Sequence, residues 1–181
     1  VEALRYLYLN KINNKDEHFV FNNNKSIQIL VLGDYLAKNT HHQISILEKS
    51  FPYFSSNVKI IVKPHTNCPI IPSDYPKIKM KISMDPLRTL LKKCHVAYTS
   101  NLTSAAIDAY CVGLPVISCI NPNSLNMSPL RSYGEVDFIS TEDELVNALK
   151  KIVSKPRKNI DPTSFFWLDH DLSRWKKLLE S

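Results

Sequence analysis

The side chains best suited to bind an anion lie together between Thr99 and Ser104. A short apolar run, 95–98, precedes them and is typical of a buried strand. Threonine, serine and asparagine cap the first N–H groups of a helix, so we expect a helix to begin at 99–101. Hydroxyls, an amide and free backbone N–H groups at the positive end of a helix dipole favour phosphate or carboxylate binding. The candidates in this turn are Thr99, Ser100, Asn101, Thr103 and Ser104.

A cation and an imidazole follow another apolar run. Lys63, Pro64 and His65 come directly after the β-prone segment 58–62. Proline holds the preceding residue extended and cannot prolong a strand ladder, so Lys63 and His65 should be displayed just past the strand end. The ammonium would supply fixed positive charge, and the imidazole could donate a hydrogen bond or a proton.

Gly33, Asp34, Asp108, Asn126 and Ser128 complete the candidate set. Gly33 and Asp34 end the aliphatic run 27–32. Asp108 lies one turn beyond Ser104, within reach of a ligand held at the start of the expected helix. Asn126 and Ser128 lie in the long loop 121–133, and loops of this length inside a compact domain are often functional.

The elements that must position these side chains form an α/β pattern. Buried strands alternate with amphipathic helices, which is the pattern of a doubly wound, mainly parallel sheet with helices on both faces. Strands are expected at 27–32, 58–62, 77–82 (at the sheet edge), 95–98, 116–117 and 136–139, and helices near the caps Thr40, Asp85, Thr99 and Thr141. The sequence thus predicts a Rossmann-like, six-stranded sheet whose polar residues gather along the carboxyl ends of the strands.

The two ends of the chain differ from this central pattern. We expect residues 1–25 to be a linker helix and loop arriving from a missing N-terminal domain, because the chain begins at Val1. Residues 26–154 would form the Rossmann-like domain. The basic, proline-containing link and apolar helix of 155–181 should dock on this domain or on the absent one.

Composition narrows the classes of function. The chain has 181 residues, a net charge of +6 and four cysteines without zinc-site spacing, which we interpret as reduced thiols. No apolar run reaches the roughly 18 residues that cross a bilayer, so we expect a cytoplasmic protein. The positive charge suits an anionic ligand, whereas scattered lysines without a basic stripe argue against nucleic acid.

The familiar nucleotide and hydrolase motifs are absent. Only three glycines occur, and neither a G-x-G-x-x-G fingerprint, a Walker A loop nor a G-x-S-x-G elbow is present. Asp169-His170-Asp171 has the letters of a metal-binding D-x-D, but it precedes an amphipathic run and is better interpreted as a helix cap. We therefore expect no metal and no cofactor.

The order of the motifs resembles a known family. K-P-H, then T-S-N-x-T-S, x-x-D-A-x-x-x-G-x-P-V-I and an N-x-S-P-L loop are similar to the C-terminal, donor-binding half of GT-B glycosyltransferases. The resemblance covers about 27–152 and points to bacterial surface-carbohydrate biosynthesis proteins, and more loosely to sialyl-, polysialyl- and Kdo-transferases.

This resemblance implies roles for individual residues. His65 stands where the family has a histidine that contacts the nucleotide phosphate, with Thr66 in place of the family's proline. Thr103 and Ser104 match paired hydroxyls on that phosphate, and Asp108 replaces a ribose-binding glutamate. The donor would be a nucleotide sugar, with the motifs favouring CMP, and the catalytic base would belong to the N-terminal domain. The chain would then be inactive alone and would meet the inner membrane face through its acceptor.

Other interpretations stay open at this point. A nucleotide-sugar epimerase or hydrolase of the same fold would need its own acidic group, for which Asp34 is the obvious candidate. A non-catalytic sugar-nucleotide-binding or scaffold module would keep the fold without chemistry. Locally, Thr103 and Ser104 could merely cap a helix, and Asn126 and Ser128 could merely shape a turn.

Overall fold

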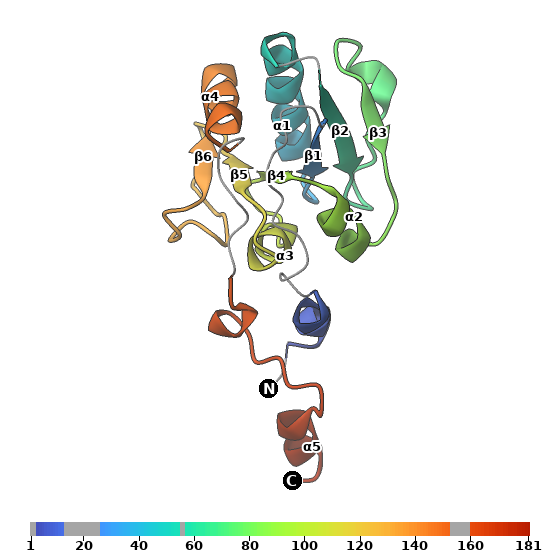
Figure 1. Ribbon diagram of the computed structural model, residues 1–181, viewed down its shortest axis with the longest axis vertical. Helices are drawn as coiled ribbons and strands as arrows, with labels where there is room; N and C mark the ends of the chain where they lie inside the picture. The colour runs from blue at the N-terminus through green and yellow to red at the C-terminus, as the bar shows by residue number, and fades with distance from the viewer. Residues whose placement is uncertain (1–2, 13–25, 55–56, 153–159) are drawn as a thin grey trace.

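The computed structural model describes residues 3–12, 26–54, 57–152 and 160–181. Its centre is a six-stranded sheet with the order β3-β2-β1-β4-β5-β6, in which every neighbouring pair is parallel (Figure 1). The strands are β1 (Ile27–Leu32), β2 (Val58–Lys63), β3 (Met80–Ile82), β4 (Val96–Ser100), β5 (Val116–Cys119) and β6 (Asp137–Ile139). The predicted doubly wound, six-stranded α/β fold is confirmed.

Helices connect and flank these strands. The α-helices are α1 (Ala37–Ser50), α2 (Leu87–Lys93), α3 (Ala105–Cys111), α4 (Glu142–Ile152) and α5 (Ser173–Leu179). Short 3-10 helices are η1 (Leu4–Lys11), η2 (Phe51–Tyr53), η3 (Pro72–Asp74) and η4 (Pro162–Ser164).

Both faces of the sheet are covered, because alternate residues of a strand point to opposite sides. In β1, Ile29 and Val31 pack with apolar side chains of α1 and α4. Leu30 and Leu32 pack with those of α2 and α3 on the other face. Figure 1 shows α1 and α4 above the sheet and α2 and α3 below it. This double burial explains the continuous aliphatic run of β1.

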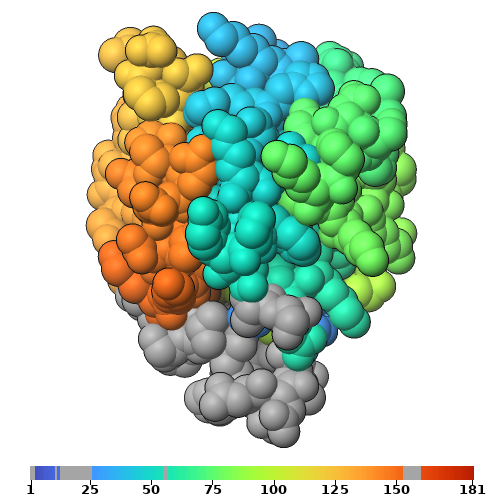
Figure 2. All heavy atoms as spheres, turned by 90° about the horizontal axis from the view of Figure 1, so that it is seen from above, coloured from blue at the N-terminus to red at the C-terminus, as the bar shows by residue number. Residues whose placement is uncertain are grey.

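The parallel arrangement gathers the carboxyl ends of the strands along one edge of the sheet. In Figure 2 the start of α1 (light blue) and the loop after β5 (yellow) lie at the same end of the molecule. The strand order reverses between β1 and β4, so the crevice expected of such folds lies outside these two strand ends.

The two terminal segments form a further layer on the outer side of α3 (Figure 1). The backbone N–H of Ala3 donates to the carbonyl of Trp167 at 2.8 Å, and the Asn10 amide donates to the carbonyl of Leu168 at 2.7 Å. The rings of Tyr6 and Phe166 stack with centroids 4.0 Å apart. η1 and the segment after η4 are therefore fixed to each other as well as to α3.

The last helix does not share this burial. No residue of α5 is buried, and Leu178 and Leu179 are 57% and 80% exposed. Leu168, within the expected docking segment 155–181, is buried, whereas α5 is not. The division of the chain into a linker, a domain and a docking segment stays a prediction. Residues 13–25 and 153–159, parts of the expected linkers, lie outside the described residues.

Several expected helix starts are wrong. α1 begins at Ala37, before the expected cap Thr40, which is fully buried inside the helix. Thr99 and Ser100 do not start a helix, because they continue β4 and pair with Ser118 and Cys119 of β5. Pairing with a neighbouring strand outweighs the local capping preference of these residues. α3 accordingly starts later, at Ala105.

Candidate functional site at the carboxyl edge

A buried carboxylate joins the ends of β1 and β4, where the strand order reverses. Asp34 is 1% exposed, and its carboxylate accepts a hydrogen bond from the hydroxyl of Ser100. It also accepts from the backbone N–H of Leu36 at 2.6 Å and from the Asn39 amide at 3.2 Å. Since a buried carboxylate needs such partners, we interpret Asp34 as the anchor of the loop that starts α1.

Gly33 lets α1 approach this loop closely. A Cβ atom at Gly33 would lie 3.0 Å from Cγ2 and 3.1 Å from Oγ1 of Thr40. The Thr40 hydroxyl donates to the carbonyl of Asp34 at 3.2 Å and accepts from its N–H at 3.1 Å. The absence of a side chain at Gly33 therefore lets Thr40 pack against the backbone of this loop. Its predicted nucleotide contact, and that of Asp34, stay predictions.

Lys63 and His65 lie at the end of β2, as the K-P-H pattern predicts. Lys63 Nζ donates to the carbonyl of Asp85 at 2.8 Å, which leaves two ammonium hydrogens for other acceptors. His65 Nδ1 accepts from the N–H of Asn67 at 3.2 Å, so the ring proton of the neutral imidazole is on Nε2. The ring of Tyr35 lies edge-on to His65, with centroids 6.4 Å apart.

The polar turn after β4 divides into buried and accessible positions. Thr99 and Ser100 are buried at 0% and 1% exposure, and the Thr99 hydroxyl donates to the carbonyl of Ile117. Thr103 is nearly buried and accepts from the N–H of Ala105 at 3.4 Å, a weak cap. Ser104 is exposed. It is therefore the hydroxyl of this turn that a ligand can reach without rearrangement.

Asp108 is not open to solvent in this structure. It is 1% exposed, and its carboxylate accepts from the hydroxyl of Tyr8 and pairs with Arg5 at 3.2 Å. Burial raises the pKa of Asp108, an effect that the Tyr8 hydrogen bond and the Arg5 charge partly offset. Contact with a ribose would require the side chains of η1 to move away, so this role stays a prediction that the observed geometry opposes.

The loop after β5 is held in place by Asn101. Its amide donates to the carbonyl of Leu125 at 2.8 Å, and its Oδ1 accepts from the N–H of Met127 at 3.0 Å. Asn126 Oδ1 accepts from the N–H of Ser128 at 3.0 Å, an Asx turn. Ser128 is fully buried and accepts from the N–H of Leu130. These side chains are turn formers here, so the interpretation of Asn126 and Ser128 as turn residues is supported.

The predicted residues share one edge of the sheet but form separate contact groups. β1 lies between β2 and β4, so the ends of β2 and β4 are separated by about two strand spacings, roughly 10 Å. Within the described residues, no hydrogen bond or ion pair joins Lys63 or His65 to Thr103 or Ser104. A ligand with several anionic groups could bridge this separation.

Arg5 and Tyr8 were missed by the sequence analysis. Arg5 lies 2.9 Å from the hydroxyl of Ser104, although the two residues are 99 positions apart in the chain. Their spacing of three residues places Arg5 and Tyr8 on one side of the expected N-terminal helix, which is the signal available in the sequence. No local sequence pattern indicated that Asp108 is the carboxylate that Arg5 and Tyr8 contact.

No metal centre or membrane-spanning helix occurs in the described part of the chain. No group of three or more histidine, cysteine, aspartate or glutamate side chains lies close enough together there to hold a metal ion. None of its helices combines the length and the apolar character needed to cross a bilayer.

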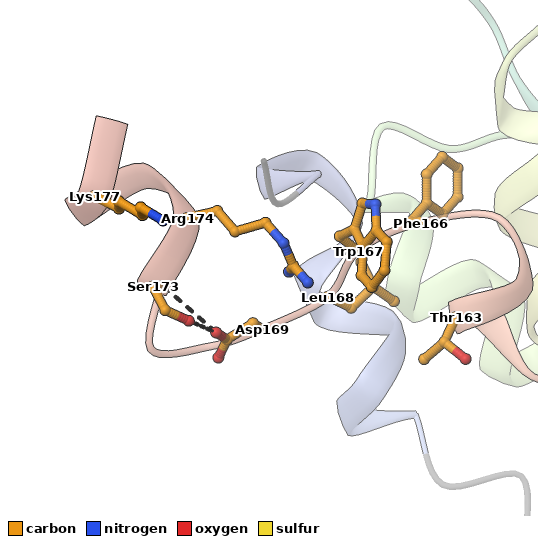
Figure 3. Close-up of a pocket in the computed structure, with 8 residues that line it drawn as sticks. All are labelled: Thr163, Phe166, Trp167, Leu168, Asp169, Ser173, Arg174 and Lys177. Carbon is orange, nitrogen blue, oxygen red and sulfur yellow. Dashed lines mark hydrogen bonds between the residues drawn. The ribbon is translucent and has the colours of Figure 1, made fainter. Parts of the chain in front are cut away.

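A separate hollow of about 590 Å³ lies between η4 and α5 (Figure 3). The guanidinium of Arg174 lies 3.9 Å above the ring of Trp167, and the Asp169 carboxylate accepts from the hydroxyl of Ser173. The N–H of Ser173 also donates to this carboxylate, at a long 3.4 Å, but the cap position of α5 is Leu172, whose side chain makes no capping bond. The interpretation of Asp169-His170-Asp171 as a helix cap therefore stays a prediction. None of the predicted site residues lines this hollow.

Comparison with known proteins gives matches in structure but not in sequence. The chain matches no protein-family model and no curated protein sequence. The UDP-GlcNAc 2-epimerase from Methanocaldococcus jannaschii, solved with UDP-GlcNAc and UDP, superposes with a TM-score of 0.60 at 15% identity. The match covers 98% of this chain and 52% of the epimerase.

Glycosyltransferases are also similar in structure. The catalytic domain of cholesterol-α-glucosyltransferase from Helicobacter pylori has a TM-score of 0.53 at 16% identity, covering 70% of this chain and 86% of that domain. The glycotransferase of kitacinnamycin has a TM-score of 0.52 at 15% identity, covering 78% and 38% of the two chains. The fold is one half of the GT-B architecture. The chain spans about half the length of the epimerase. The finer resemblance to sialyl-, polysialyl- and Kdo-transferases stays a prediction.

Proposed function

We propose that this chain binds a nucleotide sugar at the carboxyl edge of its sheet and is the donor-binding half of a metal-independent glycosyltransferase. The observation that carries the proposal is the reversal of the strand order between β1 and β4, with the half-buried Lys63 and His65 and the exposed Ser104 following strand ends on the same edge of the sheet. The structural likeness to enzymes whose names include UDP-GlcNAc and glucosyl transfer supports the same ligand class.

The chemistry of such a site is electrostatic. As the glycosyl bond breaks, negative charge grows on the departing phosphate, and Lys63, His65 and Ser104 would stabilise it. His65 would hydrogen-bond to this phosphate, and proton donation to it is the second role open to the ring. Its Nδ1 accepts from the N–H of Asn67, which leaves Nε2 as the ring nitrogen that can donate to a ligand.

The cellular setting belongs to the same proposal. A role in bacterial surface carbohydrate synthesis, suggested by the order of the motifs, would use a cytoplasmic donor, which the motifs predict to be CMP-linked, and an acceptor at the inner face of the membrane. The catalytic base would come from a second domain, so the isolated chain should bind the donor without turning it over.

An epimerase is the second candidate, favoured by the superposition on the M. jannaschii enzyme. It would need an acidic group in the cleft. The carboxylate of Asp34, the candidate named from the sequence, is 1% exposed and occupied by Leu36, Asn39 and Ser100. This disfavours epimerisation by the described residues of the chain. A binding module without chemistry is the third candidate.

Calorimetric titration of the chain with CMP, UDP, GDP and dTDP, alone and as their sugars, tests the proposal. His65→Ala and Ser104→Ala should each weaken binding by about 1 to 3 kcal/mol, the range for a lost charge-assisted hydrogen bond. Asp171→Ala on the exposed loop before α5 is the control and should bind as wild type. Binding that neither site variant changes would contradict the site. Epimerised or hydrolysed sugar formed by the chain alone would favour the second candidate, and no response to any nucleotide would end the proposal.

A further inference from the structure

The N-terminal 3-10 helix brings a guanidinium to the accessible hydroxyl of the proposed site. Arg5 Nη1 donates to Ser104 Oγ at 2.9 Å, and Nη2 pairs with Asp108 Oδ2 at 3.2 Å. The side chain of Arg5 is nevertheless 56% exposed, whereas that of its partner Asp108 is 1% exposed. The cation is therefore fixed on one side and open to solvent on the other.

Asp108 and Tyr8 determine the orientation of this guanidinium. The Tyr8 hydroxyl donates to Oδ1 of Asp108, which leaves Oδ2 for Arg5. Burial, the Asp108 charge and the hydrogen bond to Asp108 raise the pKa of Tyr8, so the phenol stays protonated and remains a donor at neutral pH. A buried carboxylate with two fixed partners is the usual means of holding an arginine in one geometry.

The element that carries Arg5 is itself held firmly. Leu9 is buried against the α2 and α3 face, and Tyr6 stacks on Phe166. The Arg5 guanidinium lies 5.1 Å from the centroid of the Tyr6 ring, a cation–π distance. These contacts reduce the conformational entropy that Arg5 would lose on binding a ligand.

An exclusively structural role accounts poorly for this arrangement. An ion pair whose cation is more than half exposed contributes little to stability, because water screens it. Burying Asp108 for that gain alone would be unfavourable. A guanidinium offers five N–H donors in a planar fork that matches the oxygens of a phosphate, and the two contacts observed leave donors free.

We propose that Arg5 is a further ligand for the phosphate groups of the donor, with Asp108 and Tyr8 as positioning residues that hold its guanidinium beside Ser104. The inference rests on the proposed function, since it assigns one more binding residue to the same site. It also gives Asp108 a part in donor binding that needs no contact with the ribose.

Titration of the full chain with UDP and CMP tests this assignment. Arg5→Ala should weaken binding about tenfold or more, the expected scale for losing charge-assisted bonds to phosphate. Arg5→Lys should recover part of this loss, because it keeps the charge and loses the fork. Arg174→Ala is the control: it removes the same charge from α5, remote from the strand ends, and should leave affinity unchanged. Thermal unfolding of each variant checks that it is folded.

A second measurement separates the ligand from its positioning residues. Arg5→Ala should make the affinity less dependent on salt concentration, because one cation no longer contributes. Tyr8→Phe should lower the affinity while the salt dependence stays as in the wild type, because this substitution changes no charge and Arg5 keeps its own. Asp108→Asn should also lower the affinity, but it removes a negative charge from the site, so its salt dependence is not compared.

The outcomes distinguish the two proposals. Wild-type binding with unchanged affinity in Arg5→Ala would overturn the role of Arg5 and leave the proposed function intact. Tighter binding in Arg5→Ala would show that Arg5 competes with the ligand for Ser104, and would also overturn it. No binding of either nucleotide by the wild-type chain would refute the proposed function, and the role of Arg5 with it.

Discussion

At the scale of residues, burial decides what the polar side chains of this edge can do. Asp34, Thr99, Ser100 and Ser128 have the chemistry expected of ligands, yet each is at most 1% exposed and bonded inside the protein. Their partners lie up to 66 positions away, as Asp34 and Ser100 do. Residue type and local spacing predicted polar groups at the strand ends. Residue type and spacing could not predict which of these groups would form hydrogen bonds with residues distant in the sequence and so be closed to a ligand.

Asp108 provides a prediction about pH. Because burial raises the pKa of Asp108 above that of an exposed aspartate, folding binds a proton to this carboxyl in the window between the unfolded and the folded pKa. The stability contributed by the protonated form is fully present below the unfolded pKa and is lost as pH rises through the folded pKa. Asp108→Asn removes this titration, so the stability of the variant relative to wild type should rise across the window.

Urea unfolding of both proteins between about pH 3.5 and pH 7 measures the effect. The exposed Asp171→Asn variant is the control and should follow the wild-type curve. A variant that loses stability relative to wild type as pH rises would show that Arg5 and Tyr8 stabilise the charged carboxylate more than burial destabilises it, contrary to the prediction.

At the scale of elements, the bounds of the strands were predicted from the sequence more accurately than the starts of the helices. β1 matches the predicted 27–32, and β2 extends the predicted 58–62 by Lys63. β3 begins at Met80, after the expected 77, because the N–H of Ile78 bonds to the carbonyl of Tyr75 in a turn. Continuous aliphatic runs specify double burial, whereas threonine and serine suit both a strand and a cap. The layer of η1 and η4 on α3 depends on contacts between the chain ends, which no local pattern encodes.

The capping box of α4 is an element that the sequence did predict. Thr141 Oγ1 accepts from the N–H of Glu144 at 3.3 Å, and Glu144 accepts in return from the N–H of Thr141 at 3.2 Å. Thr141→Ala should lower the free energy of unfolding by about 1 kcal/mol, the usual cost of a lost N-cap. Thr141→Ser keeps the hydroxyl and should lose much less. Chemical denaturation measures both, and equal losses in the two variants would argue that the methyl group, not the cap, matters.

At the scale of the whole molecule, the four cysteines are divided between the two hydrophobic cores, one core on each face of the sheet. Cys68 and Cys119 lie in the core on the side of α1 and α4, and Cys94 and Cys111 lie in the core on the other side. All four are buried and are present as thiols. Burial raises the pKa of Cys111 to about 12 and that of Cys119 to about 11, so little reactive thiolate forms at neutral pH.

The native chain should therefore react very slowly with iodoacetamide at pH 8, and the urea-unfolded chain should incorporate four equivalents, which mass spectrometry can count. If unfolding is a single cooperative event, the four thiols should become reactive together as urea increases. Rapid labelling of one cysteine in the absence of denaturant would instead reveal local opening of the face on which it lies.

The hydrogen bond between Ala3 and Trp167 means that the chain enters and leaves the α/β body at one place, on the outer side of α3. Because the two terminal segments are bonded to each other there, a substitution that displaces η1 should also loosen the segment around Trp167. The position of Arg5 beside Ser104 thus depends on contacts made by residues more than 150 positions further along the chain.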